Sequence, residues 1–271
     1  MKGRVLICAG SDSGGGAGIQ ADIKAVTALD GFAMTAITAL TAQNTHGVQD
    51  VMGVPVDFVK LQISMVLTDL GADAIKTGML ADVATINAVF DALAEHGAGI
   101  PVVVDPVMIA KGGHPLLAQE AVETLRRRAM PVAALLTPNI PEAEAMTGRT
   151  ILDLEGMRAA GRKLVAEGAQ AVMVKGGHLD GPVVHDLLVT ADGEEVFEGS
   201  RIDSRHTHGT GCTLASAIAA GLAQGRGLPE SVRRGRAYLR LAMLAAPGYG
   251  GGHGPLNHAV TLDQAILDSL G

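Results

Sequence analysis

The chain has 271 residues and a formal net charge of −7, and 48% of its residues are hydrophobic while 2% are aromatic. This acidic balance, with no long basic segment, argues against nucleic acid and anionic membrane surfaces as partners. No apolar run reaches the ~18 residues that a membrane span needs, and the N-terminal residues do not form a signal peptide. Two cysteines do not make a disulfide framework. We therefore expect a soluble, cytoplasmic protein.

Short apolar runs alternate with helical patterns along most of the chain. The predicted strands are residues 4–8, 33–44, 73–77, 101–105, 133–137 and 170–175. The predicted helices are residues 18–30, 56–70, 82–96, a segment near 116–129, 141–147 and 153–168. Residues 183–202 hold two strand-like runs separated by ADG, which predicts an antiparallel hairpin. Helices are expected from residue 210 to the end, interrupted by a Gly-rich stretch at 247–255.

The repeated strand–helix units predict an α/β fold, with a mostly parallel sheet and helices on both of its faces. No linker or internal repeat divides the chain, so we expect a single domain over residues 1–271. Ligands of such sheets bind at the carboxyl ends of the strands. Polar or Gly-rich segments follow the predicted strands at that edge, which makes this edge the expected site.

The loop GSDSGGGAG at residues 10–18 matches neither the phosphate-binding pattern GxxxxGK followed by Ser or Thr nor the dinucleotide pattern GxGxxG. Two interpretations remain open. The loop is either a flexible turn between a strand and a helix, or a place where the backbone closely approaches a small ligand. The number of glycines favours the second interpretation.

The segment HTHGTGCT at residues 206–213 has three interpretations. His206, His208 and Cys212 are potential zinc ligands, or the histidines lie by chance beside the start of a helix. The favoured interpretation is an anion site, because Gly209–Gly211 would leave backbone N–H groups at a helix N-terminus exposed to an anion. The same positive potential is expected to lower the pKa of the Cys212 thiol. Such an anion site beside a base suits phosphoryl transfer to an alcohol.

Several charged and amide side chains fall at the ends of predicted strands. Asn139 and Glu142 in TPNIPEAE either begin a helix or place a carboxylate beside a phosphate site, where it would hold Mg²⁺. Asp105 in DPVM is a second carboxylate candidate for Mg²⁺. Lys175 ends an apolar strand, where a lone lysine is either solvated or meets an anion.

The end of the second predicted strand carries an amide that suits a heterocycle. Gln43, followed by Asn44, offers a donor and an acceptor together, which matches an aminopyrimidine edge. Met79 either packs on a flat ring or fills the core.

The motifs together resemble the hydroxymethylpyrimidine/phosphomethylpyrimidine kinases of thiamine biosynthesis, members of the ribokinase-like superfamily. The resemblance runs from about residue 4 to 258 and rests on GSDSGGGAGIQADIKA, TALTAQNTHGV, IKTGML, DPVM, TPNIPEAE, VKGGH, HGTGCTLASAIAA and GHGPLNH. GTGC is the most specific of these motifs, since the wider superfamily usually has Asp in place of Cys212. His114 is a departure, because relatives often have Asp there.

The resemblance implies a three-layer α/β/α sandwich, often a homodimer, that binds ATP and Mg²⁺. It also implies two successive phosphorylations, first of the hydroxymethyl group of 4-amino-5-hydroxymethyl-2-methylpyrimidine and then of the resulting monophosphate. For the pyrimidine, the resemblance implies that Gln43 pairs with the ring and that Gly10, Asp22, Met79 and Val107 line the pocket. For ATP and Mg²⁺, it implies that Lys175 and Asn139 bind the nucleotide and that Glu142 and Asp105 bind the metal ion. For the reaction itself, it implies an anion hole made of Gly209, Thr210 and Gly211, with Cys212 as the base.

Other functions remain open at this point. A pyridoxal or pyridoxine kinase of the same superfamily is the nearest alternative, because its substrates are also flat nitrogen heterocycles with a hydroxymethyl group. A sugar kinase is disfavoured by Cys212. A non-catalytic pyrimidine-binding protein would keep the same fold, since fold does not determine function.

Overall fold

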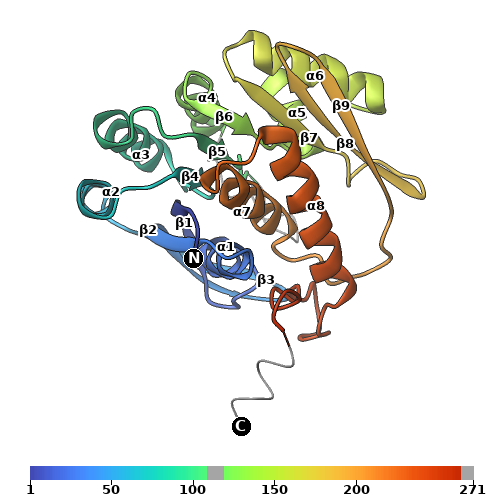
Figure 1. Ribbon diagram of the computed structural model, residues 1–271, viewed down its shortest axis with the longest axis horizontal. Helices are drawn as coiled ribbons and strands as arrows, with labels where there is room; N and C mark the ends of the chain where they lie inside the picture. The colour runs from blue at the N-terminus through green and yellow to red at the C-terminus, as the bar shows by residue number, and fades with distance from the viewer. Residues whose placement is uncertain (109–118, 264–271) are drawn as a thin grey trace.

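The computed structural model describes residues 1–108 and 119–263 (Figure 1). His114 and the first residues of the helix predicted near 116–129 lie outside the described residues. The strands are β1 (Arg4–Asp12), β2 (Phe32–Asn44), β3 (Gly47–Gly53), β4 (Ala74–Thr77), β5 (Val102–Val104), β6 (Ala133–Leu136), β7 (Ala171–Lys175), β8 (Val183–Thr190) and β9 (Glu194–Ser200). The helices are α1 (Gly18–Ala28), α2 (Val56–Asp69), α3 (Val83–His96), α4 (Gln119–Ala129), α5 (Ile140–Thr147), α6 (Leu154–Ala166), α7 (Thr210–Ala223) and α8 (Leu228–Leu244).

The strands form one nine-stranded sheet in the order β3-β2-β1-β4-β5-β6-β7-β8-β9. Neighbouring strands from β2 through β7 pair in parallel, whereas β3, β8 and β9 pair antiparallel at the two edges. The mostly parallel sheet and the hairpin β8–β9 confirm the predicted fold class. Sequence reasoning missed β3, because its GVQDVMG sequence lies at an edge, is largely exposed and lacks a clear apolar alternation.

Side chains of the central strands point alternately to two apolar cores. Leu6 and Cys8 of β1 face the core covered by α2 to α6, whereas Val5 and Ile7 face the core covered by α1, α7 and α8 (Figure 1). Helices therefore cover both faces, which gives the predicted three layers. None of the helices in the described ranges combines the length and apolarity that crossing a membrane requires.

Two element boundaries shape the site. Strand β1 runs to Asp12, four residues beyond the predicted end at residue 8, so the Gly-rich loop proper is only Ser13–Ala17. Helix α7 begins at Thr210, directly after Gly209, whose φ of 82° favours glycine. The Gly-rich stretch at 247–255 interrupts the helices as predicted, but the expectation of further helix after it is wrong for residues 256–263, where the chain forms turns and irregular structure.

Candidate active site

A cavity of about 1060 Å³ opens at the carboxyl edge of the parallel strands. Its lining includes Gly10 near the end of β1, Gln43 near the end of β2, Met79 after β4, Val107 after β5 and Lys175 at the end of β7. This arrangement confirms that the polar segments following the strands converge. The volume is at the upper end of the range for single-ligand pockets, so it has room for a nucleotide and a small heterocycle together.

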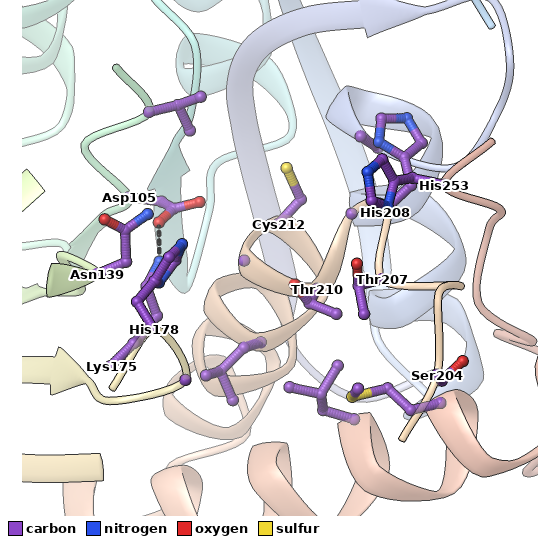
Figure 2. A pocket seen from close by; sticks show the side chains of 18 of the residues that line it. Asp105, Asn139, Lys175, His178, Ser204, Thr207, His208, Thr210, Cys212 and His253 are labelled. Carbon is purple, nitrogen blue, oxygen red and sulfur yellow. Dashed lines mark hydrogen bonds and ion pairs between the residues drawn. The ribbon is translucent and has the colours of Figure 1, made fainter. Parts of the chain in front are cut away.

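Lys175 and Asp105 lie at one side of this cavity (Figure 2), and Glu142 lines the cavity beside them. Lys175 Nζ donates to Asp105 Oδ1 at 2.9 Å and lies 3.9 Å from Glu142 Oε2. Thr137 Oγ1 donates to the same Asp105 oxygen at 3.1 Å. Burial opposes ionisation of Asp105, but the charges of Lys175 and Lys76 hold its pKa below the ordinary value. Lys175 therefore brings a cation to the cavity wall.

Glu142 is held in place by the start of α5. Asn139 is the N-cap: its side chain accepts from the Glu142 N–H at 3.0 Å, and Glu142 Oε2 accepts from the Asn139 N–H at 2.7 Å. This reciprocal pair is a capping box. Burial raises the pKa of Glu142 to about 7, which the charge of Lys175 opposes and that of Asp105 reinforces. The box explains the predicted helix start, and it also directs the carboxylate of Glu142 to the cavity.

Asp105 and Glu142 are suited to a magnesium ion by the chemistry of their donors. Both present hard carboxylate oxygens at the cavity wall, and Mg²⁺ typically binds through one or two carboxylates together with substrate phosphates. The charge of Asp105 raises the pKa of Glu142, so a divalent cation near the pair would relieve their repulsion. The residues present therefore fit the ion that the resemblance implies.

The N-terminus of α7 lies beside this charged group. A Cβ added to Gly211 would lie 3.3 Å from Lys175 Nζ and 3.5 Å from Asp105 Oδ2. The helix start thus closely approaches the lysine because residue 211 has no side chain. Thr210 and Gly211 also line the cavity, where the N-terminal N–H groups and dipole of a helix favour an anion. The structure brings the predicted anion hole and Lys175 together.

Cys212 lies on the first turn of α7, between Lys175 and His208 in the view of Figure 2. The predicted lowering of its pKa is wrong. Burial raises the pKa of the Cys212 thiol to about 12, and the nearby carboxylates of Asp22 and Asp105 add to this effect. The charge of Lys76 acts in the opposite direction but does not overcome burial. The thiol is therefore protonated at neutral pH, because desolvation outweighs the potential of the helix terminus.

Asp12 organises the Gly-rich loop, and Gly10, Ala17 and Gly18 of the segment 10–18 also line the cavity. The Asp12 carboxylate accepts from the N–H groups of Gly14, Gly16 and Ala17 at 2.8, 3.0 and 2.8 Å. A Cβ at Gly209 would lie 1.8 Å from the Gly16 carbonyl oxygen. The expected close approach exists, but its partner is the segment before α7. The glycines thus serve to bring two parts of the chain together.

The predicted pyrimidine-pocket residues do not all reach the cavity. Gln43, Gly10, Met79 and Val107 line it, and a Cβ at Gly10 would lie 2.4 Å from Met79 Cε. Asp22 does not line it: its carboxylate is fully buried on α1. Asp22 was expected to line the pocket, but the structure places it behind the cavity wall.

Asp22 is instead part of a buried charge pair that sequence reasoning missed. Lys76 Nζ donates to its two oxygens at 3.0 and 2.9 Å, and Ser216 Oγ donates to Oδ1 at 2.7 Å. Lys76 itself lines the cavity and ends an apolar strand nearly as Lys175 does. A lone lysine near the end of an apolar strand is therefore a sequence signal that could have identified Lys76 as well as Lys175.

The zinc interpretation of the HTHGTGCT segment fails. Within residues 1–108 and 119–263, no group of three or more His, Cys, Asp or Glu side chains is arranged to hold a metal ion. His208 instead lies 2.8 Å from Asp12 Oδ2 and 2.9 Å from Gln43 Nε2. The role of His208 beside Gln43 was not predicted, because these residues are distant in sequence.

Known proteins similar to this chain include enzymes named as pyrimidine and pyridoxal kinases. The chain is 50% identical over 263 residues to a thiamine biosynthesis bifunctional protein of Geobacter sulfurreducens, covering 97% of this chain but 54% of that protein, so it spans about half of that relative. It is 46% identical to a hydroxymethylpyrimidine/phosphomethylpyrimidine kinase of Streptomyces coelicolor, covering 96% of each chain. The solved structure of Bacillus subtilis pyridoxal kinase with ADP matches with a TM-score of 0.89 at 34% identity, covering 97% of this chain and 100% of that one.

The family assignment rests on the length of the match as well as on these relatives. The sequence model of the phosphomethylpyrimidine kinase family matches residues 12–257. That range contains Gln43, Lys175 and the N-terminus of α7, which the fold brings to one cavity. The chain belongs to the phosphomethylpyrimidine kinase family.

Proposed function

We propose that the chain transfers phosphate from ATP to the hydroxymethyl group of 4-amino-5-hydroxymethyl-2-methylpyrimidine and then to the resulting monophosphate. One observation carries this proposal: a single cavity holds an amide suited to an aminopyrimidine, Gln43, and an anion site made of Lys175 and the N-terminus of α7. A relative from Streptomyces coelicolor is named for the same two activities. The place of both steps is thiamine biosynthesis, as the names of the relatives suggest.

Transfer proceeds by displacement at the γ-phosphorus. The substrate hydroxyl oxygen forms a bond to this phosphorus, the bond to the β–γ bridging oxygen breaks, and ADP leaves. Lys175 and the N–H groups at the start of α7 stabilise the negative charge on the transferring group, because both face the same region of the cavity. In the second reaction the attacking atom is a phosphate oxygen of the monophosphate.

Asp105 and Glu142 are the residues that would hold Mg²⁺, and Asn139 keeps Glu142 in position through the capping box. The ion supplies charge neutralisation for the phosphates when bound. Lys175 already contacts Asp105 at 2.9 Å. A phosphate that binds beside Lys175 therefore competes with Asp105 for the ammonium group.

Cys212 acts as the base for the first reaction in this proposal. Its pKa of about 12 means that the thiol is not a ready-made thiolate. That value already includes the favourable effects of Lys76 and of a hydrogen bond from the Gly18 backbone, so Cys212 would act through the small thiolate fraction present near neutral pH. The hydroxyl must lose a proton during attack, whereas a phosphate monoester is already anionic near neutral pH. Cys212 therefore contributes more to the first phosphorylation than to the second.

The test is product analysis with two substrates. Purified protein is incubated with Mg-ATP and either the hydroxymethylpyrimidine or pyridoxine, and products are followed by mass spectrometry. We expect pyrimidine monophosphate followed by diphosphate, with a higher kcat/KM than for pyridoxine. Phosphorylation of pyridoxine alone would establish the alternative activity. ATP that remains unconsumed with either compound would indicate a binding protein.

A pyridoxal kinase is the second candidate because of a specific structural similarity. Bacillus subtilis pyridoxal kinase matches with a TM-score of 0.89 at 34% identity. The sequence identity of 46% to the Streptomyces coelicolor pyrimidine kinase is higher. This difference favours the pyrimidine as the preferred substrate.

We also propose a single-domain, cytoplasmic homodimer. Both cysteines, Cys8 and Cys212, are free, which suits a reducing compartment. Phe58 and Met65 of α2 are 56% and 62% exposed, and exposed apolar side chains on one helix face suit a contact between subunits. Light scattering would detect twice the chain mass for the wild type and the monomer mass for Phe58→Asp/Met65→Asp.

A further inference from the structure

His208 lies between an acidic side chain and the amide expected to recognise the pyrimidine. Its Nε2 atom is 2.8 Å from Asp12 Oδ2 and 2.9 Å from the Gln43 side-chain nitrogen. The three residues come from the segment before α7, from the end of β1 and from the end of β2. The side chains of His208 and Asp12 are only 13% and 4% exposed, so their contact is shielded from water.

Asp12 can only accept a hydrogen bond from His208. Its Oδ2 atom already accepts from the N–H groups of Gly16 and Ala17, and its Oδ1 accepts from Gly14. Burial alone would raise the pKa of Asp12, but hydrogen bonds from His208 and from these backbone groups hold it below the ordinary value. An ionised carboxylate has no proton to donate. His208 Nε2 must therefore carry the hydrogen of this contact.

An Nε2–H group on His208 determines which end of the Gln43 carboxamide faces it. The amide nitrogen is a donor only, so two N–H groups would oppose each other if it faced His208. The amide oxygen is an acceptor, and a half-turn of the carboxamide exchanges the two atoms in nearly the same space. The single Nε2–H is then shared between Asp12 Oδ2 and Gln43 Oε1 as a three-centre hydrogen bond. We propose that His208, held by Asp12, is a positioning residue that keeps Gln43 Oε1 toward Nε2–H and the Gln43 NH₂ group available to a ring nitrogen.

This orientation determines the class of pyrimidine that the cavity accepts, given the proposed function. A 4-aminopyrimidine presents an amino donor beside a ring-nitrogen acceptor, which matches Oε1 and the NH₂ group of Gln43 in the fixed sense. A 4-oxopyrimidine presents the opposite pattern, a carbonyl acceptor beside a ring N–H donor. Its recognition would require the half-turn that Nε2–H of His208 opposes. The His208–Asp12 pair is therefore a specificity determinant for amino against oxo pyrimidines.

Matched ligands and variants test this assignment. Dissociation constants are measured by calorimetry for 4-amino-5-hydroxymethyl-2-methylpyrimidine and for 5-hydroxymethyl-2-methylpyrimidin-4-one, together with kcat/KM for each. For the wild type we expect preference for the amino compound by on the order of 10², since a reversed edge leaves buried polar groups unpaired. His208→Leu removes the donor, frees the amide to turn, and should lower the preference at least tenfold.

Two further variants separate positioning from a general structural effect. His208→Gln places an amide nitrogen near the position of Nε2 and should retain the preference. His96→Leu, on α3 and outside the cavity lining, should retain both the preference and the activity. An unchanged preference in His208→Leu would overturn the proposal, as would a wild type that binds both pyrimidines equally.

A spectroscopic measurement on the free wild-type protein needs neither variants nor turnover. The ¹⁵N chemical shifts of His208 report which ring nitrogen carries hydrogen, and we expect hydrogen on Nε2. A bare Nε2 would overturn the proposal. Absence of binding by either pyrimidine would refute the proposed function and the specificity role, whereas hydrogen on Nε2 would still support the amide orientation.

Discussion

Two lysine–aspartate pairs occupy neighbouring parts of the same fold and differ in what surrounds them. Lys76, on β4, contacts both oxygens of Asp22, and both side chains are 0% exposed. Lys175, at the end of β7, contacts one oxygen of Asp105, and its side chain is 13% exposed. Lys76 is fully buried and holds both oxygens of its aspartate, while Lys175 is partly exposed and donates to one oxygen only.

The difference shows how one residue pair can serve the fold and another the chemistry. Asp22 accepts a third hydrogen bond from Ser216 of α7, so the buried pair joins α1, β4 and α7. The open pair lies against Gly211, where the phosphate of the proposed reaction would compete with Asp105 for Lys175. We therefore expect changes at the first pair to reduce stability and changes at the second to reduce turnover.

Removing the buried cation should have the largest effect. Lys76→Met leaves the Asp22 carboxylate without its charged partner, and we expect the free energy of unfolding to fall by about 3–5 kcal/mol. Urea denaturation measures this loss. The double variant Lys76→Met/Asp22→Leu should recover most of it, because no uncompensated charge remains. A single variant as stable as the wild type would show that the pair does not stabilise the fold.

Removing the open cation should act on turnover. Lys175→Met takes away the ammonium group that faces the transferring phosphate in the proposed mechanism, and we expect kcat to fall by roughly 10²- to 10³-fold. Its loss of unfolding free energy should be smaller than that of Lys76→Met. Steady-state kinetics beside urea denaturation measures both quantities. Lys175→Arg, which keeps the charge, should retain more activity, and full activity of Lys175→Met would remove Lys175 from the mechanism.

Charges of both lysine–aspartate pairs affect the pKa of the Cys212 thiol. If Cys212 is the base, the rate of the first phosphorylation should depend on pH. Cys212→Ala should slow the first phosphorylation by on the order of 10² and the second by less. Because the thiol pKa is about 12, the thiolate fraction rises with pH up to that value. The wild-type rate of the first step should therefore increase between about pH 8 and 10, above the pKa of Glu142, and the variant should lose this slope.

The second phosphorylation is the internal control for that profile. Its acceptor is a monoester whose second pKa is about 6, and Glu142 has a pKa of about 7, so its rate should be flat above about pH 8, where both groups are ionised. Single-turnover measurements from the two substrates give both profiles. Equal losses of the two rates in Cys212→Ala, or a flat profile for the first, would contradict a base role.

A methyl group beside the open pair should have the smallest effect. In Gly211→Ala the new Cβ would lie 3.3 Å from Lys175 Nζ, which displaces the lysine by a few tenths of an ångström. We expect kcat to fall about tenfold, while unfolding changes by less than about 1 kcal/mol, because alanine favours a helix over glycine. Unchanged kinetics would mean that this close approach has no part in turnover.

The two pairs also show how much could be predicted from sequence. Lys175 and Asp105 were found because each ends a strand, and parallel strands bring their carboxyl ends to one edge. Lys76 follows the same pattern but its partner Asp22 lies on α1, and no local signal reports their contact. The pairing of His208 with Asp12, 196 residues apart, was hidden for the same reason.

The prediction from local sequence was wrong for the pKa of Cys212, because burial in the folded protein opposes the effect of the helix terminus. Gly209, Thr210 and Gly211 line the cavity, as the predicted anion site requires, but the pKa of Cys212 depends on desolvation by the whole fold. The edge strand β3 was missed because exposed edge strands need no apolar alternation. The mostly parallel sheet and the helices on both of its faces, by contrast, follow from the repeated strand–helix pattern.

The most direct test of the central claim is a ³¹P NMR time course of the wild-type protein with Mg-ATP and 4-amino-5-hydroxymethyl-2-methylpyrimidine in one tube. We predict loss of the ATP γ-phosphate signal, a transient monoester signal and then the paired signals of a pyrimidine diphosphate. ATP that stays intact, or that yields only free phosphate, would contradict the account.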